Sequence, residues 1–323
     1  MARITPCLEN GKTAQVRCLN DGEIGFGSTE YIIFRAKDGV DPNYLYYLIC
    51  SSLVRDPAIK SMVGSSGRQR VQTNVVANLQ VSVPDLEEQI KIGGLLKALD
   101  DKIQLNTQIN KNLFKQAQTL YKDRFINLAS FDGTKMPKKW HIGTISEIID
   151  LHDSKRVPLS SRERKKLDKI YPYYGATSVM DYVDRYLFDG IYLLLGEDGT
   201  VVDDKGFPIL QYVEGKFWVN NHAHIITGKN GFTVELLYLL FSLTNVKSIV
   251  TGAVQPKISQ ASLNKVTVLI PDADELECFN SLIQPFFSQI RNLKAENDRL
   301  ATIRDSLLPN LMSGEINVSD IDL

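Results

Sequence analysis

Apolar residues recur at alternating three- and four-residue steps along two long stretches of the chain, one after Pro84 and one after Pro271. This is the a/d spacing of a heptad repeat, which predicts coiled-coil helices. Each apolar stripe is narrow and needs a partner, and the other helix of the same chain is the nearest one. We therefore predict an antiparallel pair in which the helices meet through Leu99, Ile103, Asn110, Leu113, Phe286, Ile290, Asn297 and Leu300.

The two stretches belong to a duplication. The segment RVQTNVVANLQVSVPD, which begins at Arg70, matches KISQASLNKVTVLIPD, which begins at Lys257, in residue class at almost every position. The same shift of 187 residues relates the two heptad seams, so Asn110 and Asn297 hold equivalent places. A buried Asn in a seam fixes the register of the helices at some cost in stability. A place on a wetted edge of the pair is the alternative.

A globule with helices and strands is predicted before each long helix. Asp41 caps a short helix whose counterpart begins at Thr233, and strand-like runs cover 191–195, 209–213 and 222–226. Each copy then has a loop with Gly and Gln, a strand and a proline. LENGK at 8–12 matches GEDGT at 196–200. The predicted fold class is α+β, with a first globule (1–85), a long helix (86–128), a second globule (129–271), a second long helix (272–314) and a tail (315–323).

The composition is that of a globular protein of two ordinary domains, with 323 residues, 43% hydrophobic and 23% charged. No apolar run approaches the length of a membrane span, and the N-terminus lacks a signal-peptide pattern, so we expect a cytoplasmic protein with no membrane partner. The four cysteines form no CxxC pair. Because the net charge is only −1, binding to nucleic acid requires a local basic patch.

Two globules that each lead into a long helix resemble the specificity subunit of type I restriction-modification enzymes. The motifs that carry the resemblance are PKKWHIGTISEII, YPYYGATSVMDYVDRYLFDGIYLLLGEDGT, GAVQPKISQASLNKVTVLIPD and SLLPNLMSGEI, with ITPCLENGKTA and GRQRVQTNVVANLQVSVPDLEEQIKI in the first copy. The resemblance covers nearly the whole chain. It implies that each globule is a target-recognition domain for one half of a bipartite site in double-stranded DNA. It also implies that the paired helices dock methyltransferase (modification) subunits, which restriction/translocase subunits then join.

The two copies are unequal in this resemblance. The second globule begins near Pro137, well before GEDGT, whereas only a few residues precede LENGK in the first. We therefore expect the first target-recognition domain to lack its N-terminal part, and sequence preference to come from one half-site. A helical-hairpin scaffold that assembles without reading DNA is the alternative function.

A basic segment lies inside the second globule. SKRVPLSSRERKKLDK, from Ser154 to Lys169, contains Glu163 and Asp168 against seven cations and has a local balance of +5. Such a segment can neutralise phosphates and make affinity depend on salt. A solvated loop is the ordinary alternative. The predicted phosphate contacts are Lys155, Arg156, Arg162, Arg164, Lys165, Lys166 and Lys169.

Two equivalent loops carry side chains suited to base edges, Gln255 and Lys257 in the second copy and Arg68, Gln69 and Arg70 in the first. Gln pairs with adenine and Arg with guanine in the major groove. The alternative is a turn that only orders the following strand. The aromatic cluster YPYY at 171–174 is predicted to be core rather than a DNA contact.

The sequence gives little support for catalysis. His222 and His224 would share a face of a strand, near Glu197 and Asp198, but two histidines without a third ligand motif are weak evidence for a metal site. The sequence has neither a GxxxxGK[ST] motif nor a GxGxxG fingerprint. We therefore predict a non-catalytic protein without a cofactor or metal, whose partners carry out methyl transfer and ATP hydrolysis.

Overall fold

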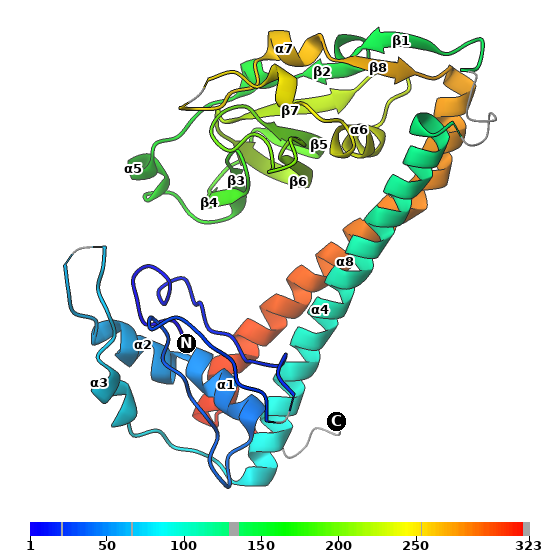
Figure 1. Ribbon diagram of the computed structural model, residues 1–323. Helices are drawn as coiled ribbons and strands as arrows, with labels where there is room; N and C mark the ends of the chain where they lie inside the picture. The colour runs from blue at the N-terminus through cyan, green and yellow to red at the C-terminus, as the bar shows by residue number, and fades with distance from the viewer. Residues whose placement is uncertain (21, 66, 129–135, 253, 319–323) are drawn as a thin grey trace. The chain divides into compact units, whose positions relative to one another are not determined.

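The computed structural model describes residues 1–20, 22–65, 67–128, 136–252 and 254–318 (Figure 1). These residues form two compact units. Unit 1 comprises Met1–Gln108 with Leu293–Leu323, and unit 2 comprises Ile109–Asn292. In the described ranges, no helix combines the length and apolar character that crossing a bilayer requires.

Two long helices contribute to both units. Helix α4 spans Leu86–Tyr121 and continues as a π-helical turn over Lys122–Ile126, and α8 spans Ala273–Ser313. In unit 1, Arg304 Nη1 lies 2.6 Å from Asp100 Oδ1, and Asn106 Nδ2 donates to Asn297 Oδ1 at 3.0 Å. In unit 2, Asn110 Nδ2 donates to the Ile290 carbonyl at 3.3 Å. Partner numbers fall along α8 as they rise along α4, so the predicted antiparallel pairing is confirmed.

The eight residues predicted to pair the helices are all half-buried, and none of them is exposed. Other positions with the same heptad spacing are fully buried, namely Leu96, Ala117, Ile283 and Leu293. Asn106 is 0% exposed, and its Nδ2 donates to both Glu296 and Asn297. Donation from this buried amide nitrogen to Glu296 and Asn297 requires this register, which is how Asn specifies pairing in coiled coils, while Asn106 Oδ1 is buried without a hydrogen-bond partner among the described residues.

The globule of unit 1 consists of three helices on a small core. The helices are α1 (Pro42–Cys50), α2 (Ser52–Lys60) and α3 (Thr73–Ala77). Asp41 accepts a hydrogen bond from the Tyr44 amide and caps α1 as predicted. The core includes Leu8, Tyr44, Leu96 and Leu311. The described residues before Leu86 contain isolated β-bridges but no strand.

The strand predicted before Pro84 is therefore not formed. Its counterpart in unit 2, β8 (Thr267–Ile270), pairs antiparallel with β1 (His141–Thr144). Residues 80–83 have no such neighbour among the described residues of unit 1. A strand requires hydrogen bonds from an adjacent backbone, and the side-chain pattern alone cannot supply them.

Unit 2 contains a six-stranded sheet with the order β2-β7-β5-β6-β3-β4. All neighbours are antiparallel except β3 and β6. The strands are β2 (Ile149–Leu151), β3 (Tyr171–Tyr174), β4 (Val179–Val183), β5 (Phe188–Gly196), β6 (Leu210–Val219) and β7 (Ala223–Gly228). The remaining helices are α5 (Ser161–Arg164), α6 (Val234–Ser242) and α7 (Gln260–Asn264), with 3-10 turns at Ile145–Glu147, Asp153–Lys155 and Lys247–Ile249.

Helix α6 covers one face of the sheet and packs against the unit-2 parts of α4 and α8 (Figure 1). Leu193 and Leu195 of β5 face this core, whereas Leu194 faces the opposite side with Phe217, as the alternation of a strand requires. Arg291 of α8 donates to Tyr212 of β6 at 2.7 Å and to Glu235 of α6 at 2.9 Å. These contacts fix the sheet to the helix pair within unit 2.

Candidate nucleic-acid interface

The basic segment Ser154–Lys169 forms an exposed loop around the single turn α5. Ser160 and Glu163 close a capping box at its start, which fixes the turn locally. The segment separates its seven cations into two groups. Four are exposed and have no side-chain hydrogen bond or ion pair among the described residues, namely Lys155, Arg162, Lys165 and Lys166. These four are free to meet phosphates.

The other three cations bind carboxylates of their own domain. Arg164 lies 3.1 Å from Asp181, and its guanidinium lies 4.8 Å from the ring centre of Tyr173. Lys169 lies 2.8 Å from Asp181 and also donates to the carbonyls of Arg164 and Tyr182. Arg156 lies 2.5 Å from Glu197 and 3.5 Å from Asp153. The phosphate role of these three stays a prediction, and the contacts give each a role inside the domain.

The predicted loop of unit 2 is a hairpin. Thr251 and Lys257 exchange backbone hydrogen bonds at 2.9 and 2.8 Å, and Lys257 also forms a bridge with Asp198. At the tip, Val254 is 100% exposed and Gln255 is exposed. Gly252 has φ of +85°, and a Cβ there would collide with the Gln255 carbonyl oxygen. Glycine is required because the backbone turns back on itself at this point.

Unit 1 contains an equivalent hairpin. Val63 and Arg70 exchange backbone hydrogen bonds at 3.0 and 2.9 Å, and Arg70 also forms a bridge with Ile4. Gly64 has φ of +135°, and a Cβ there would lie 2.9 Å from the Arg68 carbonyl oxygen. Arg68 is exposed at the tip and Gln69 is half-buried. The two predicted loops are thus the same structural device.

These hairpins correct the alignment of the copies upstream. In unit 2 the amides of Gly199 and Ile258 donate to Pro256 and Glu197, at 3.0 and 2.8 Å. In unit 1 the amides of Thr5 and Val71 donate to Gln69 and Arg3, at 3.0 and 2.8 Å.

The equivalent of 197–199 is therefore 3–5, and the match of 8–12 to 196–200 is wrong. Two turns that share glycine and an acidic residue look alike in sequence, but the backbone hydrogen bonds define the equivalence.

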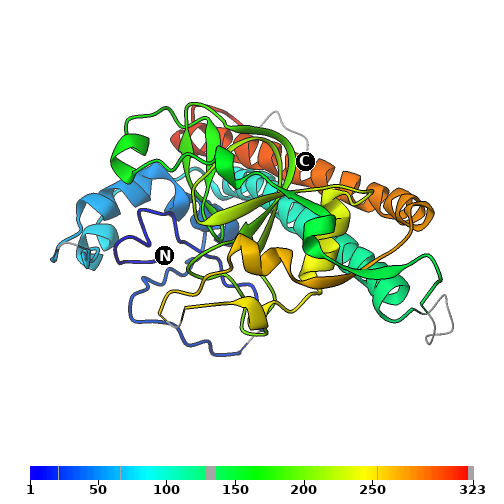
Figure 2. The same cartoon turned by 90° about the horizontal axis from the view of Figure 1, so that it is seen from above.

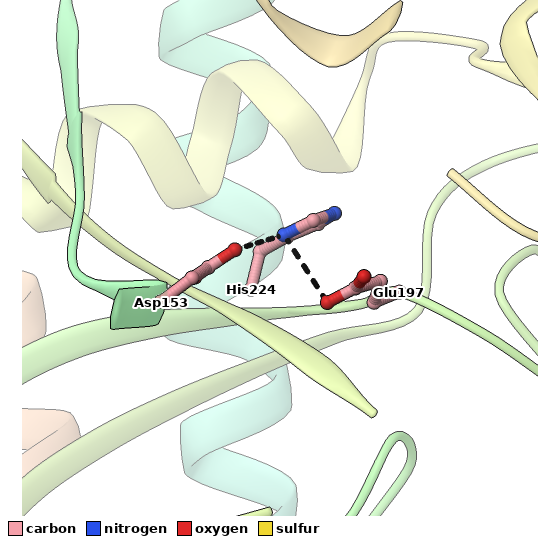
Figure 3. A group of neighbouring side chains, drawn as sticks. All are labelled: Asp153, Glu197 and His224. Atoms are coloured by element: carbon pink, nitrogen blue, oxygen red, sulfur yellow. Dashed lines mark hydrogen bonds and ion pairs between the residues drawn. The ribbon is translucent and has the colours of Figure 1, made fainter. Parts of the chain in front are cut away.

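A buried charged network supports the hairpin of unit 2 (Figure 3). His224 of β7 is 0% exposed, and its Nδ1 lies 2.6 Å from Asp153 and 3.7 Å from Glu197. Its Nε2 lies 2.8 Å from the Ile258 carbonyl oxygen, just past the hairpin. Because a carbonyl oxygen only accepts, Nε2 carries the proton of that bond. Gln260 also donates to Asp153 at 2.5 Å.

The network keeps both acids ionised. Burial acts to raise the pKa of Asp153, but hydrogen bonds and charge from His224, with bonds from the Ile225 amide and Gln260, hold that pKa below its usual value. Burial likewise acts to raise the pKa of Glu197, and Arg156, His224 and Lys257 lower it overall.

The three side chains Asp153, Glu197 and His224 have ligand atoms within 4.8 Å of one another, the spacing of a metal site. Their hydrogen bonds use the same atoms. Arg156 already contacts both carboxylates, and both ring nitrogens of His224 have partners. A cation here would have to displace Arg156, so the donor set does not fit a metal ion. Sequence reasoning considered Glu197 and His224 but missed Asp153, because the partner lies 71 residues from His224 and only the sheet joins them.

The hairpin Thr251–Lys257 and α5 both lie at the end of unit 2 away from its parts of the long helices, at opposite edges of that end (Figures 1 and 2). Arg162 belongs to α5, Lys165 and Lys166 follow it directly, and Gln255 belongs to the hairpin. Tyr173 is buried with Val183 and Trp218, in agreement with the core role predicted for the aromatic cluster.

Comparisons with known proteins identify the family of this chain. The family model described as "Type I restriction modification DNA specificity domain" matches residues 9–115 and again 137–304. The MjaIX type I restriction enzyme specificity subunit of Methanocaldococcus jannaschii is 26% identical over 311 residues, covering 88% of this chain and 71% of the relative. The HindI specificity subunit of Haemophilus influenzae is 20% identical over 380 residues, covering 90% of this chain and 81% of the relative.

Among solved structures, the type I restriction-modification S subunit from M. genitalium shares the fold, with a TM-score of 0.52 at 17% identity over 84% of this chain and 73% of that one. The two matches to the family model place the chain in the class of DNA specificity proteins. The chain belongs to the type I restriction-modification specificity subunit family.

Proposed function

We propose that this chain reads one half of a bipartite DNA target through unit 2 and docks methyltransferase subunits on its helix pair. The observation that carries the proposal is the exposed hairpin tip, Val254 and Gln255, in the same unit as four exposed cations that have no side-chain partner among the described residues. Phosphate contacts position a protein and base contacts specify sequence, and the two sets supply these two parts.

We assign sequence recognition mainly to unit 2 because unit 2 contains a complete sheet. Six strands support the hairpin and α5 there, whereas the described residues before Leu86 form only isolated bridges. Recognition geometry requires a rigid support, since base readout depends on hydrogen-bond distances and angles. Unit 1 carries an equivalent hairpin on a smaller scaffold, and we assign it a minor part in sequence preference.

The helix pair offers a surface for partner chains. In unit 2 a shallow hollow of about 460 Å³ lies on the two helices, lined by Asn112, Lys115, Gln116, Thr119, Leu120 and Phe286. We propose that a methyltransferase subunit contacts this surface and that restriction/translocase subunits join through it. In this proposal the partner subunits carry the catalytic residues and this chain carries none. The complex acts on DNA, so we place it in the cytoplasm.

Binding selection from random duplexes tests the half-site proposal, with the chain co-expressed with the methyltransferase encoded beside it. We expect one conserved half-site to be recovered. Recovery of two half-sites at fixed spacing would show that unit 1 reads DNA as well. Recovery of no preference would favour the alternative, a scaffold that assembles without reading DNA.

A further inference from the structure

The cations at the base of the two hairpins are neutralised within their own domains. Lys257 Nζ lies 3.2 Å from Glu197 Oε1. Arg70 binds Glu30 through two nitrogens, with Nη2 2.6 Å from Oε1 and Nε 2.9 Å from Oε2. The backbones of Lys257 and Arg70 also form two β-bridges each, one with the opposite side of the hairpin and one with a segment of the domain outside it. Each cation therefore sits where the hairpin leaves the domain.

The carboxylate that binds the base cation comes from different backbone positions in the two units. The amide of Glu197 donates to the His222 carbonyl at 2.8 Å, and in unit 1 the amide of Arg3 donates to the Glu30 carbonyl at 3.0 Å. Glu30 therefore stands at the position of His222, while Arg3 stands at that of Glu197. The acid has moved to the neighbouring segment, yet it still binds the base cation.

The acid in unit 2 is itself held in place. Arg156 binds Glu197 Oε2, leaving Oε1 to Lys257. The Glu197 side chain is 12% exposed, whereas that of Lys257 is 49% exposed. A fixed carboxylate at the hairpin base restricts the Lys257 side chain to one direction.

We propose that Lys257 and Arg70 are positioning residues, which hold the hairpins so that the tips meet the bases, and that they contact neither the bases, as the sequence predicted they would, nor the phosphates. The proposal rests on the function proposed above. The tip residues, Gln255 in unit 2 and Arg68 in unit 1, are left to contact DNA. Loss of the base ion pair would let the tip move, and discrimination between bases would fall because paired hydrogen bonds to a base require fixed geometry.

Salt titration and binding selection on the methyltransferase complex separate the two roles. Lys257→Met keeps the length of the side chain and removes its charge. For a positioning residue, we expect discrimination at one base pair to fall about tenfold or more, with the salt dependence unchanged. A phosphate contact would instead reduce the slope of log K against log salt by about 0.9 and leave discrimination intact, which would overturn the proposal.

Two further variants serve as controls in the same assay. Lys257→Arg retains the ion pair and should retain discrimination. Lys165→Met removes one free cation of the basic segment and should reduce the salt slope by about 0.9 with discrimination unchanged. If the wild-type complex shows no sequence preference, the proposed function itself is refuted. If the wild-type preference survives in Lys257→Met, only the positioning role is refuted.

Hydrogen exchange without DNA gives a second, independent measurement. In Lys257→Met, the amides of Thr251 and Lys257 should exchange at least several-fold faster, while those of β5 and β6 stay protected. Arg70→Met should have the same effect on the amides of Val63 and Arg70. Unchanged exchange at both hairpin bases would overturn the positioning role even if DNA binding were altered.

Discussion

The cations of the basic segment differ in whether they bind a carboxylate of their own domain. Arg164 has a side chain 11% exposed and paired with Asp181, whereas Lys165 beside it is exposed and has no side-chain partner in the described part of the chain. An exposed, unpaired cation loses little on meeting a phosphate. A paired one must first leave its carboxylate, which costs about as much as a charged hydrogen bond, ~1.5–3 kcal/mol.

We therefore expect different results from neutralising neighbouring residues. Replacing Arg162, Lys165 and Lys166 together with Gln should reduce the salt slope of DNA binding by up to about 2.7, because each phosphate that is no longer neutralised removes about 0.9. Arg164→Gln should leave the slope unchanged and lower the unfolding free energy by about 1–3 kcal/mol. Salt titrations and urea unfolding measure the two effects. Equal changes in slope per residue would contradict this division.

The lowered pKa of Asp153 makes the stability of unit 2 depend on pH. The folded pKa lies below the unfolded value of about 3.9, so the carboxylate stabilises the fold above that value and the stabilisation is lost as pH falls through the folded pKa. Asp153→Asn should flatten the loss of unfolding free energy as pH falls below about 5 and cost ~1–3 kcal/mol at neutral pH.

Urea unfolding at several pH values measures this dependence. The neighbouring Asp150→Asn is a matched control, because Asp150 is exposed and its one ion pair among the described residues, 3.5 Å from Lys229, is a type of contact worth about 0–1 kcal/mol. Parallel pH curves for wild type and Asp153→Asn would refute the assignment.

At the scale of elements, two adjacent glycines near the start of α4 have opposite surroundings. A Cβ on Gly93 would lie 2.7 Å from the Tyr44 amide nitrogen and 2.7 Å from Asp41 Oδ1, at the start of α1. A Cβ on Gly94 would meet nothing within 4 Å. Close packing explains Gly93, and nothing in the structure explains Gly94.

Alanine at these two positions should therefore have opposite effects. Gly94→Ala should raise the unfolding free energy by about 1 kcal/mol, the ordinary gain of Ala over Gly in a helix. Gly93→Ala should lower it by about 1–3 kcal/mol, because α1 must move away from α4. Urea unfolding followed by circular dichroism compares them. A stabilising Gly93→Ala would contradict the packing seen here.

At the scale of the whole molecule, the two globules share a hairpin but differ in the structure that supports it. The family model matches both copies, and both hairpins are built alike. The sheet that carries the hairpin in unit 2 has no counterpart among the described strands of unit 1. Each long helix, in contrast, contributes one part to each unit.

Docking on the helix pair should therefore respond to changes at the hollow near Phe286. Gln116→Trp places a bulky side chain in its lining and should reduce co-purification of the methyltransferase at least several-fold. Gln289→Trp, on an exposed position of α8 outside the lining, should co-purify as wild type does. Size-exclusion chromatography of co-expressed chains measures both. Equal recovery of the two variants would place the docking surface elsewhere.

The sequence by itself determined the elements that depend on local pattern. The heptad spacing predicted α4, α8 and their pairing, because a narrow apolar stripe can be buried only against another. The cap at Asp41 and the existence of a strand near 222–226 followed from residue type. The alternation expected there is wrong, because Ala223, His224, Ile225 and Ile226 are all buried.

Only the tertiary structure decided which charged side chains are free. Asp153, Glu197 and His224 come from three separate segments, and the sheet brings them together beneath the hairpin. The same holds for Arg70 with Glu30, and for the strand that forms before Pro271 but not before Pro84. A periodic pattern depends on near neighbours in the chain, whereas ion pairs and strand pairing depend on partners that folding brings from far away.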